Sequence, residues 1–184
     1  MLVESLYNAL NETGLFQVES EDHFEAVAKL ISALGSELVF QNEKLAKDEN
    51  PELIKIGKDA MIAAEAKLQL AIKFLRSDDN DVAMETIQFI QQYLDRIRHS
   101  GQQVSRYVGQ ILIQMTLSFC SLTFHFSDIL HAIMDATVTK FRYPDNYNFD
   151  SNGLDEAECD EFMNDLKQLF ESICLVQPLV AIQM

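Results

Sequence analysis

The sequence predicts an all-α protein made of long helices joined by short polar breaks. Apolar residues recur at three- and four-residue steps along most of the chain, as one buried helix face requires, and no segment alternates like a half-buried strand. The 184 residues include only 6 Gly and 3 Pro, too few for the many turns of a sheet-rich fold. A chain of this length can bury a substantial core, either as one domain or as several helical repeats.

Three helices are expected in the first half of the chain, at about 21–45, 51–76 and from 78 to the sequence "RHSG" that ends at 101. Ser20 is a suitable N-cap for the first helix. Pro51 suits the first position of the second helix, because Pro lacks the N–H group that a helix start leaves unpaired. The Ala-rich middle of the second helix permits close packing against a neighbour.

The second half predicts apolar helices at 104–126 and about 128–141, a polar loop at 143–154, and a helix at 155–176. Pro178 can open one more helix. The run 108–126 approaches the length that spans a membrane, but Gln, Thr, Ser and His residues interrupt it. We therefore interpret this run as a buried helix, and we expect no membrane partner.

Helices of this kind form either a helical bundle or an α-solenoid, which is a stack of helical hairpins. The repeat length is about 40 to 47 residues in HEAT and armadillo arrays. Pairing the first predicted helix with the second, and the third with the apolar run, fits that repeat loosely. Periodicity by itself leaves the two architectures open.

The charge balance limits the possible functions. The chain has 14 basic and 29 acidic residues and a net charge of −15, which repels phosphate backbones and disfavours a nucleic-acid module of the usual basic kind. Local basic patches are compatible with this total. Cys120, Cys159 and Cys174 are odd in number and far apart, which indicates free thiols in a reducing compartment. The N-terminus lacks the features of a secretory signal, so an intracellular protein is expected.

No residue pattern predicts an enzyme or a cofactor. The sequence contains no phosphate-binding glycine loop, no GxGxxG and no GxSxG elbow. Glu158 and Asp160 flank Cys159, and their charges are expected to raise the pKa of its thiol and disfavour a nucleophilic thiolate. The histidines lack the spacing of zinc ligands; they are His23, His99, His125 and His131.

The polar loop carries part of a calcium-binding pattern. Asn148, Asp150, Asn152 and Gly153 stand at positions one, three, five and six of an EF-hand loop. Position one is an amide instead of a carboxylate, and position twelve is Cys159 instead of the Glu that closes the shell of oxygens. We therefore predict no metal site and interpret the segment as a solvated loop.

Two groups of charged residues are the candidate binding sites. Basic residues suit helix C-termini in any case, but five become candidates for phosphate contacts if the chain carries RNA: Arg96, Arg98, Arg106, Lys140 and Arg142. Four acids in or after the polar loop are candidates for contact with a basic protein surface: Asp150, Asp155, Glu156 and Glu158. Asp155 and Glu156 are also expected in the first helical turn, where exposed N–H groups stabilise negative charge.

Longer stretches of the chain carry a family resemblance. They are "AVAKLISALGSELV", "LAIKFLRSDDNDVAMETIQFIQQYLDRI" and above all "KFRYPDNYNFDSNGLDEAECDEFMNDLKQLF". The last contains the run Tyr147–Asp150, then Gly153, an acidic cluster ending at Ala157, and Phe162 in the following helix. This pattern resembles the exportin-T family of tRNA export receptors in the importin-β, or karyopherin, superfamily, and the likeness runs from about Asp22 to the C-terminus.

The resemblance implies a HEAT-repeat solenoid, which favours this architecture over the bundle. It also implies a non-enzymatic scaffold that carries tRNA from nucleus to cytoplasm together with GTP-bound Ran, with nuclear pore proteins as further partners. Complete receptors are many times longer, so 1–184 is expected to be a single helical-repeat segment, internal to a receptor, that exposes apolar edges. Residues 104–126 have no counterpart recognised in the family and are expected to be an apolar insertion.

The residues also allow an alternative function, that of a freestanding acidic helical adaptor which binds other proteins through an apolar groove. The two hypotheses predict different partners. A receptor segment contributes to binding of tRNA and Ran, whereas an adaptor binds proteins alone.

Overall fold

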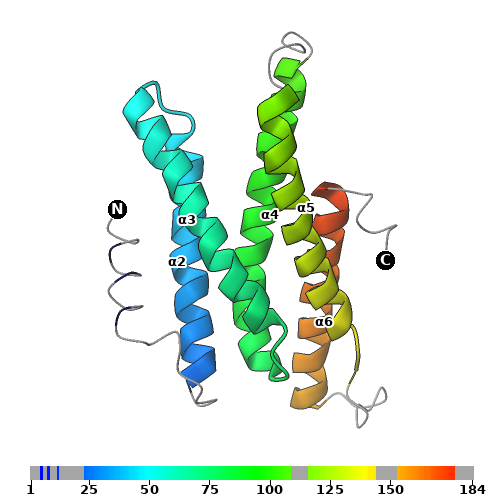
Figure 1. The fold of residues 1–184 in the computed structure, drawn as a ribbon. Helices are drawn as coiled ribbons and strands as arrows, with labels where there is room; N and C mark the ends of the chain where they lie inside the picture. The colour runs from blue at the N-terminus through cyan, green and yellow to red at the C-terminus, as the bar shows by residue number, and fades with distance from the viewer. Residues whose placement is uncertain are drawn as a thin grey trace. The chain divides into compact units, whose positions relative to one another are not determined.

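The computed structural model describes residues 23–108, 116–143 and 153–176, together with Ser5, Asn8 and Glu12, and gives only the backbone at 101–108, 116–127, 154 and 155. Its long helices are α2 (Phe24–Leu45), α3 (Pro51–Leu75), α4 (Asn80–Val108), α5 (Thr116–Lys140) and α6 (Leu154–Val176), shown in Figure 1. The described ranges contain no strand. The prediction of an all-α fold is confirmed.

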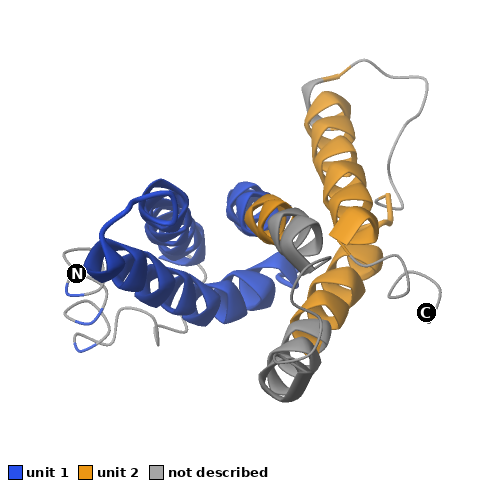
Figure 2. Ribbon diagram, turned by 90° about the horizontal axis from the view of Figure 1, so that it is seen from above, with its two compact units in different colours: residues 1–93 blue, residues 94–184 orange. Residues whose placement is uncertain are grey.

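The chain divides into two compact units, coloured separately in Figure 2. Unit 1 (Met1–Tyr93) contains α2, α3 and the first half of α4, and unit 2 (Leu94–Met184) contains the rest of α4 with α5 and α6. In unit 1, α2 packs on α3, and in unit 2, α5 packs on α6. Each unit therefore contains a pair of helices that follow one another in the chain, as expected for a fold of HEAT-like hairpins.

The hairpin of α2 and α3 is held by a cap at the start of α3 and by close contacts between the two helices. Pro51 occupies the start of α3 as predicted, and the preceding Asn50 is the N-cap, whose Oδ1 accepts a hydrogen bond of 2.9 Å from Glu52 N. Further along, the buried Asn42 side chain donates from Nδ2 to the carbonyl of Gly57 at 2.8 Å. A Cβ on Gly57 would lie 3.0 Å from Cβ of Leu45, so the absence of a side chain there allows the two helices to approach closely.

The core of unit 1 uses the predicted face on α2, but on α3 the prediction is only partly right, because Ile62 is 66% exposed and Ala66 is exposed as well. On α2 the buried apolar residues are Val27, Ala28, Ile31, Leu34, Leu38 and Val39. On α3 they are Ala60, Ala64, Leu68, Ala71, Ile72 and Leu75. Alanine supplies half of the α3 set, and these small side chains bring the backbones of neighbouring helices near one another.

The first half of α4 is held against α2 at a glycine. The ring of Phe89, which is fully buried, lies over Gly35 so closely that a Cβ on Gly35 would overlap the ring carbons Cζ, Cε1 and Cε2. Next to this contact, Ser32 Oγ donates to the carbonyl oxygen of Glu85 at 2.5 Å. Lys29 adds an exposed ion pair to Glu85 at 3.4 Å, which contributes little because water screens it.

A buried polar contact joins α3 to the end of unit 1. Tyr93 is fully buried, and its hydroxyl donates to Glu65 Oε1 at 3.0 Å. Burial, followed by the negative charge of Glu65, raises the pKa of Tyr93 well above its ordinary value. The phenol therefore stays protonated as a donor at any physiological pH. Lys67, two residues after Glu65, is buried as well.

Three predicted helix boundaries are wrong. His23 is the N-cap of α2, and its side chain makes no cap hydrogen bond; the predicted N-cap, Ser20, lies outside the described residues. The predicted separation of 104–126 from 128–141 does not exist, because α5 is one helix through Asp128. An exposed Asp within a helix costs only a few tenths of a kcal/mol, about 0.7 at most, so Asp128 does not start a new helix.

The third wrong boundary is the predicted end of a helix at "RHSG", because α4 continues to Val108. Gly101 within a helix costs only about 1 kcal/mol relative to Ala. The two residues before it bond back to their own helix, His99 Nδ1 to the carbonyl of Asp95 at 2.7 Å and Ser100 Oγ to the carbonyl of Arg96 at 2.9 Å. The polar groups of His99 and Ser100 thus form hydrogen bonds within α4, the helix that these residues were predicted to end.

In unit 2, α5 and α6 bury matching faces. The described part of α5 buries Ile129, Leu130, Ile133, Met134 and Ala136, and α6 buries Phe162, Leu166, Leu169 and Ile173. Just after α5, Phe141 meets Phe170 of α6 edge to face, with ring centroids 6.0 Å apart. The helix expected to begin at Pro178 lies outside the described residues.

Within the part of the chain that the structure describes, no helix has both the length and the apolar character needed to cross a membrane.

The contact between Gly35 and Phe89 predicts the effect of one added methyl group. Gly35→Ala should lower the free energy of unfolding by about 1 to 2 kcal/mol, because the overlap with the ring outweighs the gain in helix propensity. Urea unfolding followed by circular dichroism measures the change.

The matched control is the same substitution in a Phe89→Leu background, which lacks the ring carbons that the new Cβ would overlap. There Gly35→Ala should be neutral or stabilising. An equal loss of stability in both backgrounds would show that Phe89 does not set the requirement for glycine.

Candidate functional site

The candidate site lies where α5 ends and α6 begins. Lys140 is the last residue of α5, and the chain then turns through backbone hydrogen bonds from Phe141 N to the carbonyl of Val138 at 3.1 Å and from Arg142 N to that of Lys140 at 2.7 Å. The T-shaped contact with Phe170 fixes the ring of Phe141 on α6. The turn thus places Phe141 and Tyr143 beside the middle of α6, at Phe170 and Asp160.

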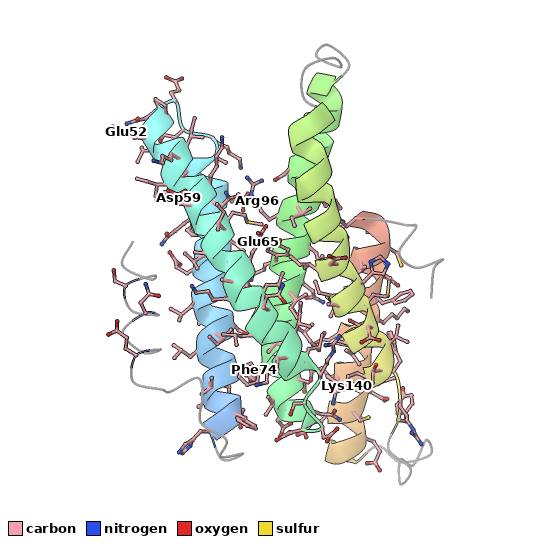
Figure 3. All side chains as sticks on the ribbon, in the orientation of Figure 1. Glu52, Asp59, Glu65, Phe74, Arg96 and Lys140 are labelled. Atoms are coloured by element: carbon pink, nitrogen blue, oxygen red, sulfur yellow. The ribbon has the colours of Figure 1, made fainter. Side chains whose placement is uncertain are left out.

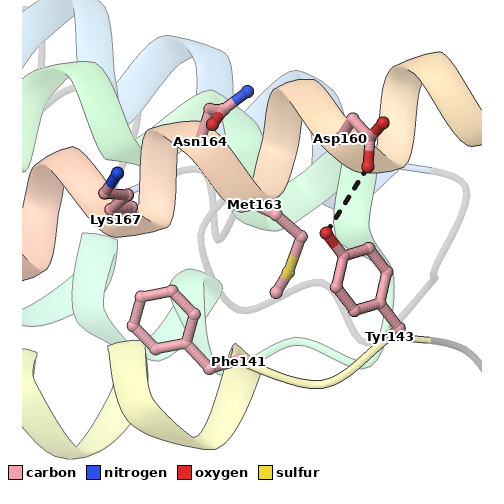
Figure 4. A pocket seen from close by; sticks show the side chains of 6 residues that line it. All are labelled: Phe141, Tyr143, Asp160, Met163, Asn164 and Lys167. Atoms are coloured by element: carbon pink, nitrogen blue, oxygen red, sulfur yellow. Dashed lines mark hydrogen bonds between the residues drawn. The ribbon is translucent and has the colours of Figure 1, made fainter.

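A shallow groove runs along α6 at this place, and Figure 4 shows its lining. The Tyr143 hydroxyl donates to Asp160 Oδ1 at 3.4 Å, a long hydrogen bond that holds the ring at one end of the groove. The Met163 side chain lies between Tyr143 and Phe141, and Lys167 lies at the end opposite Asp160. The groove therefore has an apolar floor, an acidic end and a basic end. Its lining residues are Phe141, Tyr143, Asp160, Met163, Asn164 and Lys167.

The start of α6 is strongly acidic, as the sequence predicted. Because α6 begins at Leu154, Asp155 and Glu156 lie in its first turn, where the helix dipole stabilises negative charge. Glu156 is half-buried and Glu158 is exposed. Asp150 lies outside the described residues, so the candidate acids that the structure places together are those of α6.

The acids of α6 change the titration of their neighbours. The pKa of Cys159 is raised, first by partial burial of the thiol and then by the charges of Asp160 and Glu156. The sequence predicted this direction from Glu158 and Asp160. The contribution of Asp160 is confirmed, but that of Glu158 is wrong: Glu156, three residues before Cys159 on the same helix side, takes its place. The pKa of Tyr143 is also raised, by desolvation and then by Asp160 and Cys159.

The candidate basic residues fall into separate places. Arg98 pairs with Asp95 at 3.0 Å on α4, and Arg96 lies on the same helix. Lys140 and Arg142 lie together at the end of α5. Figure 3 shows Arg96 and Lys140 far apart along unit 2. Arg106 is in the backbone-only part of α4. The described candidates therefore form two small groups and not one basic patch.

The described residues contain no group of three His, Cys, Asp or Glu side chains that could hold a metal ion. The loop residues of the partial EF-hand pattern, Asn148, Asp150 and Asn152, lie outside the described residues. The free thiols of Cys159 and Cys174 are both half-buried.

Sequence reasoning missed the groove itself. Periodicity assigned Met163 and Phe170 to the buried face of the last helix, and the structure leaves both half-buried. Phe141, the last residue of a predicted helix, is instead exposed just beyond α5. The sequence did offer one signal for the groove. Phe141 and Tyr143 are aromatic residues at a predicted helix end, where the packing of a helix face no longer decides whether a side chain is buried.

The similar proteins found by comparison all carry the same name. No family model matches the chain. It is 30% identical to Exportin-T of Danio rerio over 184 residues, 31% identical to Exportin-T of Homo sapiens over 180 residues, and 30% identical to Exportin-T of Mus musculus over 184 residues. Each alignment covers 96% of this chain and 16% of the relative. The chain thus spans about one sixth of the length of the curated relatives that it matches, and the resemblance to exportin-T is confirmed along nearly all of it.

The raised pKa of Cys159 predicts slow alkylation. In a variant with Cys120→Ser and Cys174→Ser, the alkylation rate should rise with pH along a titration curve centred above the ordinary thiol value, because burial and two carboxylates oppose thiolate formation. Asp160→Asn should increase the rate with iodoacetamide at pH 8 by about twofold to fivefold, since it removes one negative charge and lowers the thiol pKa.

Glu158→Gln is the matched control, because Glu158 is not among the causes of the raised Cys159 pKa. It should leave the rate nearly unchanged. A larger increase for Glu158→Gln than for Asp160→Asn would contradict the assignment.

Proposed function

We propose, from the similarity to exportin-T, that this chain is part of a nuclear export receptor that carries tRNA to the cytoplasm together with GTP-bound Ran. The observation that carries the proposal is about 30% identity along 96% of the chain to exportin-T of several vertebrates. In this proposal the receptor moves between nucleus and cytoplasm, and nuclear pore proteins are further partners. The chain acts as a binding scaffold and not as an enzyme.

The helical hairpins support this role physically. In a solenoid, each hairpin buries its faces on its neighbours, and the stack offers a long concave surface that can wrap a large partner. The pairs α2 with α3 and α5 with α6 are elements of the kind that such a stack requires. One segment of a receptor then contributes part of a shared surface, and tRNA is held by several segments together.

The distribution of charge suggests that different residues of this chain contact tRNA and Ran. With a net charge of −15, the chain repels phosphate at long range, so tRNA contact has to use local cations. Lys140 and the exposed Arg142 at the end of α5 form one described pair of cations for this role. The acids Glu156 and Glu158 on α6 suit a basic protein surface instead, and we assign them to the Ran side of the complex.

A chimera tests the proposal. Human exportin-T in which the matching segment is replaced by this chain should retain tRNA in a pull-down with Ran loaded with GTP, and should lose it with Ran loaded with GDP. Circular dichroism and gel filtration establish that the chimera is folded. A folded chimera that fails to form the ternary complex, while the parent receptor forms it, would argue against the proposal.

Charge reversals in the chimera separate the two partners. The double variant Lys140→Glu and Arg142→Glu should weaken tRNA binding severalfold and reduce the slope of log K against log salt by roughly 1 to 2, because each lost phosphate contact accounts for about 0.7 to 0.9 of that slope. Glu156→Lys with Glu158→Lys should weaken Ran binding and leave the salt slope for tRNA unchanged or steeper.

Lys44→Glu is the matched control, since Lys44 is an exposed cation in the last turn of α2, outside both candidate groups. If Lys44→Glu weakened tRNA binding as much as the double variant at the end of α5, the effect would come from total charge, and the assignment of Lys140 and Arg142 would be wrong.

A further inference from the structure

The groove beside α6 has a composition that general packing does not require. Phe141 is one of the few large apolar side chains of the described residues that remain exposed, at 37% of its surface, although its ring makes a T-shaped contact with Phe170. Met163 fills the floor with an unbranched side chain that can adapt its shape to a bound group. An apolar floor open to solvent offers favourable burial to a partner's side chain.

The two ends of the groove differ in charge, and both charges lie on α6. Asp160 stands at one end with Glu156 one turn before it, and Lys167 stands at the other end, seven residues later. Seven residues of helix span about 10 Å at 1.5 Å per residue. An extended peptide rises about 3.3 Å per residue, so alternate side chains at positions one, three and five cover a similar length on one face.

One wall of the groove is held in place by packing within unit 2. The edge-to-face contact with Phe170 positions the ring of Phe141, whereas the Tyr143 hydroxyl reaches Asp160 only through a long hydrogen bond of 3.4 Å. A site whose walls are already ordered loses less side-chain entropy on binding than one that has to form around its ligand.

We propose that this groove is a docking site for a short extended segment of a partner protein. The segment carries an apolar anchor that lies over Met163, a basic residue that pairs with Asp160, and an acidic residue that pairs with Lys167. The proposal goes beyond the transport function above and rests on the groove alone.

Charge selects this occupant over two others. A second copy of the chain is disfavoured because each copy carries a net charge of −15. Within the groove lining, a phosphate backbone is disfavoured because Asp160 belongs to it and Glu156, Glu158 and Glu161 lie near Asp160 on α6; the cations Lys140 and Arg142, proposed above for tRNA, flank Phe141 but are not part of the lining. A partner segment with a basic residue next to an apolar anchor is favoured instead, because its anchor is buried on the floor of the groove and its positive charge lies near Asp160.

The test uses fluorescence anisotropy with the 184-residue chain and a fluorescein-labelled peptide that contains Arg-Ser-Phe-Ser-Glu between Gly-Ser flanks. Its three recognition side chains point to one face when the peptide is extended. The peptide should bind, and the same peptide with Ser in place of Phe should bind at least about tenfold more weakly, because the anchor loses its apolar burial.

Two variants of the chain locate the charges. Asp160→Asn keeps an oxygen that can accept from the Tyr143 hydroxyl but removes the charge. It should weaken binding of the Arg-containing peptide about fivefold or more. It should not change binding of a peptide with Gln in place of Arg. Lys167→Met should likewise weaken binding only for peptides that keep Glu. Glu171→Gln, an exposed change on α6 outside the groove lining, is the matched control and should have no effect.

Several results would overturn the proposal. They are no saturable binding of the Arg-Ser-Phe-Ser-Glu peptide, equal binding of the peptide without Phe, or equal effects of Asp160→Asn on the Arg and Gln peptides. Sedimentation of the chain alone provides a further check: a dimer that Asp160→Asn or Lys167→Met dissociates would show that a second copy fills the groove. Failure of this test leaves the tRNA export proposal unaffected, since the two use different partners and readouts.

Discussion

The packing of unit 1 depends on the placement of Phe89 over Gly35. A fully buried phenylalanine ring can lie directly against a helix backbone only where the residue beneath it lacks Cβ, and Gly35 provides that place for Phe89. Because the ring lies directly on the α2 backbone, the first half of α4 comes close enough for Ser32 to donate to the carbonyl of Glu85. The same principle recurs at Gly57, where a second missing side chain lets α3 approach the end of α2.

Unit 2 uses a different means of fixing its candidate binding surface. The turn after α5 is held by aromatic contacts and a tyrosine hydroxyl, so that Phe141 and Tyr143 are ordered without being buried. The first turns of α6 then concentrate carboxylates at a helix N-terminus, which stabilises them without requiring any ligand. A surface of this kind, apolar in the middle and charged at both ends, is ordered by the fold and open to a partner. Partial burial, followed by the charges of nearby acids, raises the pKa values of Cys159 and Tyr143.

The sequence predicted the helices well, and it predicted the apolar faces of α2 and α6, because burial along them follows the 3.6-residue period. On α3 it was only partly right, since Ile62 is exposed and small alanines form much of the buried face. It predicted Pro51 as a helix start because that signal is local. It failed at "RHSG", where glycine and polar residues are weak helix breakers that a long helix overcomes. It could not reveal the contact of Gly35 with Phe89, the burial of Lys67 or the groove along α6, since these depend on residues brought together from distant parts of the chain. The candidate contacts for tRNA and Ran are still predictions.

We propose that this chain serves in a receptor that binds tRNA cooperatively with Ran. The most direct measurement is the affinity of the protein that carries this chain for tRNA, determined at one fixed salt concentration with Ran loaded with GTP and then with GDP. Cooperative binding requires that each partner raise the affinity for the other by the same factor. The account predicts much tighter tRNA binding with GTP-bound Ran and an equal enhancement of Ran binding by tRNA. The same tRNA affinity in both nucleotide states of Ran would contradict it.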